Sequence, residues 1–139
     1  MSIIEDPLDT WSSAAQSALR LVTAYLYLQH GTAKLLHVPH ISMFDNLRVL
    51  SLDGFAGMLE IGGSLLVLVG LFTQPVAFIL SGEMAVAYFI AHAPQGHFFM
   101  PALNGGEEAV LYCFIFLFFA RAGAGPWSID ALRLRRKDL

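Results

Sequence analysis

The chain has 139 residues, of which 56% are hydrophobic and 14% are charged, and its mean hydropathy is +0.61. A typical soluble domain is about 45–50% apolar and about 25% charged, so this composition excludes an ordinary soluble domain and also an intrinsically disordered chain. The formal net charge of −3 indicates no particular partner, and the single cysteine, Cys113, excludes an internal disulfide. We therefore expect a single membrane domain over residues 1–139.

Four apolar segments are each long enough to cross a bilayer, which takes about 20 mostly apolar residues. They lie at about residues 14–34, 54–73, 75–93 and 104–121. Four such helices in so short a soluble chain would have no polar shell around them. The predicted fold class is therefore all-α, a polytopic membrane protein with a four-transmembrane-helix bundle.

The residues between the segments indicate where the helices begin and end. Gln74-Pro75 separates the second and third segments and predicts a tight helical hairpin, because proline suits the first turn of a helix. Asn104-Gly105-Gly106-Glu107 has the spacing of a capping box, in which Asn104 caps the fourth helix and Glu107 reaches back to the cap amide. Gly125-Pro126 is expected to end that helix.

Basic residues are concentrated after the fourth segment, in the tail at residues 122–139. Cytoplasmic segments carry the excess of Lys and Arg, so with four spans both termini are expected in the cytoplasm. Trp11 and Trp127 fall at the same end, where indoles anchor at the membrane interface. We expect membrane lipid to be a partner of this tail, and no nucleic acid, because its few basic residues lie beside a membrane.

Ionisable side chains inside a membrane are costly, so each one is a candidate functional residue. In the first segment Arg20, Thr23, Tyr27, His30 and Lys34 share an arc of about 80° on a helix, which predicts a polar stripe facing the bundle interior. His30 and Lys34, one turn apart near the outer end, are expected to share a polar site. For Arg20, burial in the bundle and snorkelling to the interface remain equally open.

The second and third segments each carry one buried carboxylate candidate. Glu60 either holds the bundle together by pairing with the first helix or is a carboxylate in a binding cavity, and one residue can do both. Glu83, near mid-membrane, is expected to face Arg20 or Tyr27. Arg20 and Glu83 are therefore predicted to form a bundle ion pair or a proton relay.

Most of these candidates gather in the outer half of the predicted bundle. A pocket with apolar walls and a few polar groups suits a small amphipathic ligand, and a quinone headgroup fits this description. His30 and Glu60 are the predicted catalytic residues. The predicted substrate-binding or quinone-binding residues are Lys34, Tyr27, Glu107 and Asn104. Glu107 and Glu108 lie about 100° apart on a helix, so one of them is expected to face inward toward Lys34 or His30.

Other kinds of site have weaker support in the sequence. We expect no metal site, because the five histidines form no HExxH or His-x-x-x-His pattern and there is no CxxC. Cys113 lies in the apolar part of the fourth segment, where a thiolate is disfavoured. Paired histidines for haem and a Gly-rich loop for nucleotide phosphates are also missing from the sequence.

Several short motifs follow one another in a fixed order along the chain. They are Gly31-x-x-Lys34-Leu35, Glu60-x-Gly62-Gly63-x-Leu65-Leu66, Gly70-Leu71-Phe72-Thr73, the residues Met84, Ala87 and His92, Asn104-Gly105-Gly106-Glu107, and Gly125-Pro126-x-Ser128-x-Asp130. Their order and spacing resemble the DoxX family of small four-helix integral membrane proteins over nearly the whole chain. Trp127 departs from the pattern, since the family often has glycine there. The resemblance implies a four-helix bundle in the bacterial inner membrane.

The resemblance also implies a redox role. Some DoxX relatives are subunits of thiosulfate:quinone oxidoreductase, and others associate with membrane complexes of redox and thiol-stress defence. Quinone-reducing proteins of the wider clan use a cysteine pair, and this chain has only Cys113. We therefore expect a quinone-linked membrane oxidoreductase component with no covalent cofactor. The alternative is a non-catalytic subunit that anchors or organises a redox partner, and whether the chain is itself an enzyme stays open. The expected protein partners are a redox subunit or further copies of the same chain.

Overall fold

The computed structural model describes residues 7–137, and over this range the chain is helical with no strand. The main helices are α1 (Pro7–Leu36), α2 (Leu52–Val69), α3 (Thr73–Ala87) and α5 (Glu107–Ala122). The short elements are the 3₁₀ turn η1 (Ser42–Phe44), the π-helix η2 (Tyr88–His92), the 3₁₀ turn η3 (Ala93–Gln95), and the helices α4 (Pro101–Asn104) and α6 (Ile129–Lys137). The predicted all-α fold is confirmed for this part of the chain.

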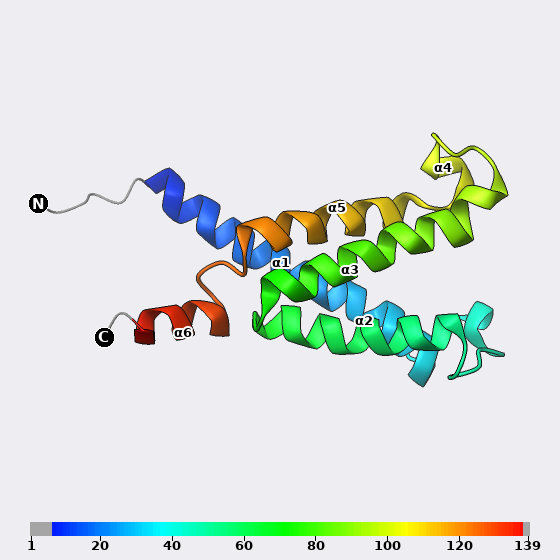
Figure 1. Cartoon of the computed structure of the whole chain (residues 1–139), viewed down its shortest axis with the longest axis horizontal. Coiled ribbons are helices and arrows are strands. Elements are labelled where there is room, and N and C mark those ends of the chain that lie inside the picture. Colours follow the sequence, from blue (N-terminus) through cyan, green and yellow to red (C-terminus); the bar gives the residue numbers. More distant parts are fainter. Residues whose placement is uncertain (1–6, 138–139) are drawn as a thin grey trace, which may run out of the picture.

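The four main helices form an elongated bundle (Figure 1). α1 packs along α2, α3 packs along α5, and the tight turn between α2 and α3 joins the two pairs. One end of the bundle carries residues 37–51 and residues 93–106, and we call it the loop end. The opposite end carries the α2–α3 turn, the link between α5 and α6, and α6 itself, and we call it the tail end.

Within residues 7–137, two helical segments are long and apolar enough to cross a membrane, namely Leu52–Val69 and Thr73–Gln95, in which η2 and η3 continue α3. α1 has 30 residues but carries the polar stripe, which lowers its apolar character. α5 is apolar but has 16 residues, slightly fewer than the roughly 17–25 of a typical span. Two of the four predicted spans are therefore supported by length and composition, and the four-span arrangement stays a prediction.

Large apolar side chains are exposed on all four main helices. Examples are Val22 and Tyr25 on α1, Phe55 and Leu65 on α2, Phe78 and Val86 on α3, and Leu111 and Phe114 on α5. The interior, by contrast, encloses polar residues, among them Ser17, Arg20, Glu60 and Ser64. An apolar surface of this extent marks contact with lipid or with other chains, so the pattern agrees with a membrane environment around the whole bundle.

The observed helix end agrees with the sequence-based prediction at α2 and differs from it at α5. Gly70 ends α2 in the left-handed conformation at φ 69°, and Leu71 N donates to Leu66 O at 2.9 Å, so the predicted hairpin is present. The predicted capping box is wrong, because Asn104 belongs to α4 and its Oδ1 accepts from Gly106 N at 2.9 Å. α5 starts at Glu107 with no side-chain cap and ends at Ala122, before Gly125-Pro126.

Gly31 marks a close approach of α1 to α2. A Cβ on Gly31 would lie 2.9 Å from both Gly57 O and Ile61 N, which are backbone atoms that cannot shift without moving α2. Gly62, on the same helix as Gly57, has open space beside it, with nothing within 4 Å of a Cβ.

These two glycines make a matched pair for testing the α1–α2 packing. We expect Gly31→Ala to lower the free energy of unfolding by about 1–3 kcal/mol through overpacking. Gly62→Ala should leave it unchanged or raise it by up to about 1 kcal/mol, since alanine favours the helix. Thermal unfolding of both variants in a mild detergent measures the difference. Equal melting temperatures for the two variants would contradict the close packing at Gly31.

Candidate functional site

Tyr27 lies at the centre of the bundle and connects three helices. Its side chain is buried, and its hydroxyl donates to Glu83 Oε2 on α3 at 3.0 Å. Its ring packs on two rings of α5, with centroid distances of 5.0 Å to Tyr112 and 4.8 Å to Phe116. The structure therefore gives Glu83 the Tyr27 partner, which was one of its two predicted partners.

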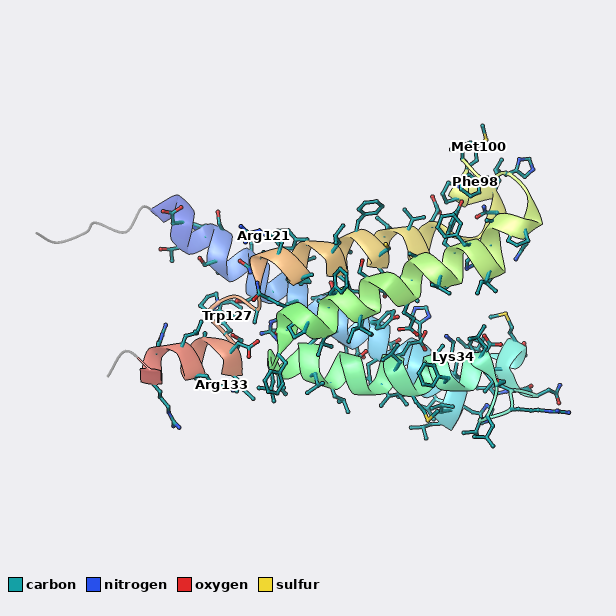
Figure 2. All side chains as sticks on the ribbon, in the orientation of Figure 1. Lys34, Phe98, Met100, Arg121, Trp127 and Arg133 are labelled. Atoms are coloured by element: carbon teal, nitrogen blue, oxygen red, sulfur yellow. The ribbon has the colours of Figure 1, made fainter. Side chains whose placement is uncertain are left out.

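Lys34 and Glu60 form an ion pair between α1 and α2, with Lys34 Nζ 2.6 Å from Glu60 Oε1. The Glu60 side chain is 1% exposed and that of Lys34 is 15% exposed, so the carboxylate is buried and the ammonium reaches it from the loop end. Lys34 Nζ also lies 5.9 Å from the centroid of the Phe44 ring, in η1. Figure 2 shows Lys34 near the loop end, on the side of the bundle formed by α1 and α2.

Each of the two carboxyl groups has one buried oxygen that accepts no hydrogen bond from the described residues, namely Glu60 Oε2 and Glu83 Oε1. Ser64, one turn after Glu60 on α2, is fully buried, and its hydroxyl likewise has no partner in the described part of the chain. Buried polar atoms are nearly always hydrogen-bonded, so these atoms are the best-placed acceptors for a ligand hydroxyl or a proton.

His30 lies at the edge of this site and faces α5. Its Nε2 is 3.7 Å from Glu108 Oε2, and its ring is 5.7 Å from that of Tyr112. The Glu108 side chain is 75% exposed, so the His30–Glu108 pair connects the molecular surface with the ring of Tyr27, 6.1 Å from His30. Of the two glutamates at the start of the fourth helix, Glu108 is therefore the one that faces His30, as predicted for one of them, although both side chains are exposed.

Asn104 belongs to a different cluster, inside the loop of residues 93–106. Its Nδ2 donates to the Tyr88 hydroxyl at 3.2 Å and to Gly96 O at 3.3 Å, and the Tyr88 hydroxyl donates to Phe98 O at 2.5 Å. In Figure 2, Phe98 and Met100 lie on the far side of the loop end from Lys34. Asn104 therefore stabilises this loop. The prediction that it lies with Tyr27 in one binding site is wrong.

Arg20 is fully buried at the tail end and has four carbonyl partners. Its guanidinium donates to Val67 O at 2.6 Å, Leu68 O at 2.5 Å, Ala124 O at 2.7 Å and Trp127 O at 2.6 Å. The predicted ion pair between Arg20 and Glu83 is therefore wrong, because backbone carbonyls occupy the donors of Arg20 and Tyr27 donates to Glu83. Because the Arg20 side chain is fully buried, it does not snorkel to the membrane interface.

Sequence reasoning missed Tyr112 as a member of the site. Glu108, Tyr112 and Phe116 recur every fourth residue on α5, so they share the helix face that meets His30 and Tyr27. Glu108 and Tyr112 are polar residues four positions apart in an otherwise apolar segment, and this spacing could have indicated that Tyr112 belongs to the site. Among the residues that the structure describes, no group of three His, Cys, Asp or Glu could hold a metal ion.

Comparison with known proteins identifies the family. A family model described as DoxX matches residues 15–93, more than half of the chain. The chain belongs to the DoxX family. The DoxX match includes the part of the site on α1, α2 and α3, with Tyr27, His30, Lys34, Glu60 and Glu83, and it ends before α5. Family membership and the apolar helices together make this DoxX chain a membrane protein.

A relative of this DoxX protein occurs in Haemophilus influenzae. It is described as an uncharacterized protein and is 49% identical over 115 residues, which cover 81% of this chain and 85% of the relative. No solved structure matches the chain.

Proposed function

We propose that this DoxX protein is a quinone-linked component of a membrane oxidoreductase. It would lie in the bacterial inner membrane, with four helices across the bilayer and both termini in the cytoplasm. The observation that supports this function best is the buried Tyr27–Glu83 hydrogen bond beside the Lys34–Glu60 ion pair. The four residues put a phenol, two carboxyl groups and an ammonium into an interior that is otherwise apolar and aromatic.

These residues fit the polar head of a quinone. When bound, a quinone supplies two-electron chemistry coupled to two protons. The buried oxygens Glu60 Oε2 and Glu83 Oε1, which lack partners among the described residues, would accept hydrogen bonds from the hydroxyls of the reduced form. Tyr27 has one hydroxyl proton, so it would turn from Glu83 Oε2 to donate to a carbonyl of the oxidised form. The rings of Tyr112 and Phe116 would form the apolar wall.

His30 and Glu108 would carry protons between the site and the surface. Glu108 is exposed, His30 is half-buried, and both lie on the side of Tyr27 that faces α5. An imidazole can both accept and donate a proton, so His30 is suited to pass protons to and from the neighbouring Glu108 carboxylate. Lys34 would hold the negative charge of Glu60 inside the bundle.

The alternative function is a non-catalytic subunit that anchors or organises a redox partner. The lone cysteine favours this alternative, because Cys113 cannot form a dithiol within the chain and its Sγ lies 3.6 Å from Ser81 Oγ on α3. For the same reason the quinone-linked function needs a partner subunit that supplies the electrons. Both functions therefore place the protein in a membrane complex.

Extraction of bound small molecules from the protein purified in mild detergent tests the proposal. We expect near-stoichiometric quinone with the native chain. Glu83→Gln and Tyr27→Phe should each weaken its retention about tenfold or more, the typical effect of losing a hydrogen bond to a charged group. Glu107→Gln is the matched control, since it removes a carboxylate outside the site and should retain the quinone. Recovery of a protein partner without quinone would favour the anchoring function instead.

A further inference from the structure

Helix α6 is held against the tail end by its first turn. The Asp130 carboxylate accepts from Phe72 N at 3.0 Å and from Thr73 N at 2.9 Å, at the start of α3. The Asp130 amide donates to Gly70 O at 2.9 Å, and a Cβ on Gly70 would collide with Ser128. The α2–α3 turn therefore fixes the position of α6, which extends outward from the four main helices in Figure 1.

A shallow hollow, largely open to the surroundings and mostly apolar in its lining, lies where α6 meets the end of α2. It is lined by Val69, Pro126, Trp127, Ser128, Ile129 and Leu132. Val69 is the last residue of α2, which is long and apolar enough to cross a membrane. The hollow therefore continues the exposed apolar surface of α2 past the end of that helix. In the four-span arrangement of the proposed function, on which this inference rests, the end of α2 would lie near the lipid headgroups.

Positive charge lies one turn farther out on the same face of α6. Arg136 follows Leu132 by four residues and Ile129 by seven, so the three side chains share a helix face. Arg136 is exposed. Arg133 lies over the Phe72 ring instead, 4.8 Å from its centroid, and with Arg135 it borders a separate groove that Phe72 and Asp130 also line. Figure 2 shows Trp127 and Arg133 at this end of the molecule.

We propose that this hollow binds one anionic phospholipid. An acyl chain would pack on Val69, Trp127 and Leu132, and the headgroup phosphate would pair with Arg136. An apolar surface followed by a cation one turn later matches a ligand with an apolar chain and a negative head. A zwitterionic lipid would fill the hollow without the net charge that Arg136 complements, and free phosphate would lack the apolar contact.

The test uses the full chain purified in a nonionic detergent. Phosphatidylglycerol or phosphatidylcholine with the same acyl chains is added, and bound lipid is counted by native mass spectrometry alongside the melting temperature. We expect one phosphatidylglycerol per chain and a higher melting temperature than with phosphatidylcholine. Arg136→Gln should bind phosphatidylglycerol about fivefold more weakly, because one basic residue contributes about that much to the attraction to an anionic surface.

Two further variants and one soluble ligand separate this site from general charge effects. Arg121→Gln removes an exposed cation at the tail end of α5 that does not line the hollow, and it should bind phosphatidylglycerol like the native chain. Leu132→Gln should weaken both lipids. Equal binding of the two lipids, an equal loss in Arg121→Gln, or equal stabilisation by inorganic phosphate would overturn the proposal.

Discussion

Arg20→Met should lower the free energy of unfolding by about 3 kcal/mol or more, because each buried carbonyl left without a donor costs about 1–3 kcal/mol. Arg20 donates to Val67 O and Leu68 O at the end of α2, and to Ala124 O and Trp127 O after α5. Val67 O also accepts from Gly70 N at 3.1 Å, but both α2 carbonyls lie at the negative end of the helix dipole, so a buried cation suits this place. The variant should melt earlier in detergent and expose residues 123–137 to limited proteolysis.

Two further variants show whether the guanidinium itself is needed. Arg20→Lys should recover little of the loss, because a compact ammonium cannot reach four carbonyls in the planar geometry of a guanidinium. Arg48→Met removes an exposed arginine from the loop of residues 37–51 and should leave the melting temperature within about a degree, as surface changes usually do. A native melting temperature for Arg20→Met would contradict the structural role.

Lys34→Met should destabilise the bundle by about 3–5 kcal/mol, because removal of one partner from a buried ion pair leaves the other charge uncompensated. Glu60 is 1% exposed and meets Lys34 Nζ at 2.6 Å, so its carboxylate would lose this ion pair in the variant. The double variant Lys34→Met/Glu60→Met should regain most of that stability, since a well-packed apolar pair often replaces a buried ion pair without loss. Thermal unfolding of the single and double variants gives the coupling energy.

The outcome of that cycle also bears on function. If the ion pair only holds the bundle together, the double variant should fold and retain any bound quinone. If Glu60 contacts a ligand, the double variant should fold yet release the quinone. Additive losses in the two single variants would instead show that Lys34 and Glu60 do not interact in the folded protein.

The side of the site formed by α1 could be predicted from the sequence, because it depends on local periodicity alone. Tyr27, His30 and Lys34 recur at helical spacing in an apolar segment, and the structure places all three around the buried site. Glu60 and Glu83 were predictable for a related reason, since a single carboxylate in an apolar helix has to find an interior partner.

The contacts of Arg20, Glu108 and Asn104 depend on tertiary packing, which local sequence patterns do not predict. Arg20 binds backbone carbonyls, which every residue has, so the sequence does not reveal that the link after α5 returns to meet it. The choice of Glu108 over Glu107 depends on the rotation of α5, which is set by the packing of Phe116 and Phe119 in the core. The capping motif at Asn104 failed because the same side chain closes the end of α4.

The carbonyl partners of Arg20 also imply an order of assembly. A chain is synthesised from its N-terminus, so Arg20 and the end of α2 exist before Ala124 and Trp127 are made. Asp130, which holds the start of α3, is made later still. The junction between the first three helices is therefore completed by residues 124–130, which leave the ribosome after all three of those helices. A chain arrested before residue 124 would hold the Arg20 guanidinium with two of its four carbonyl partners, those of Val67 and Leu68.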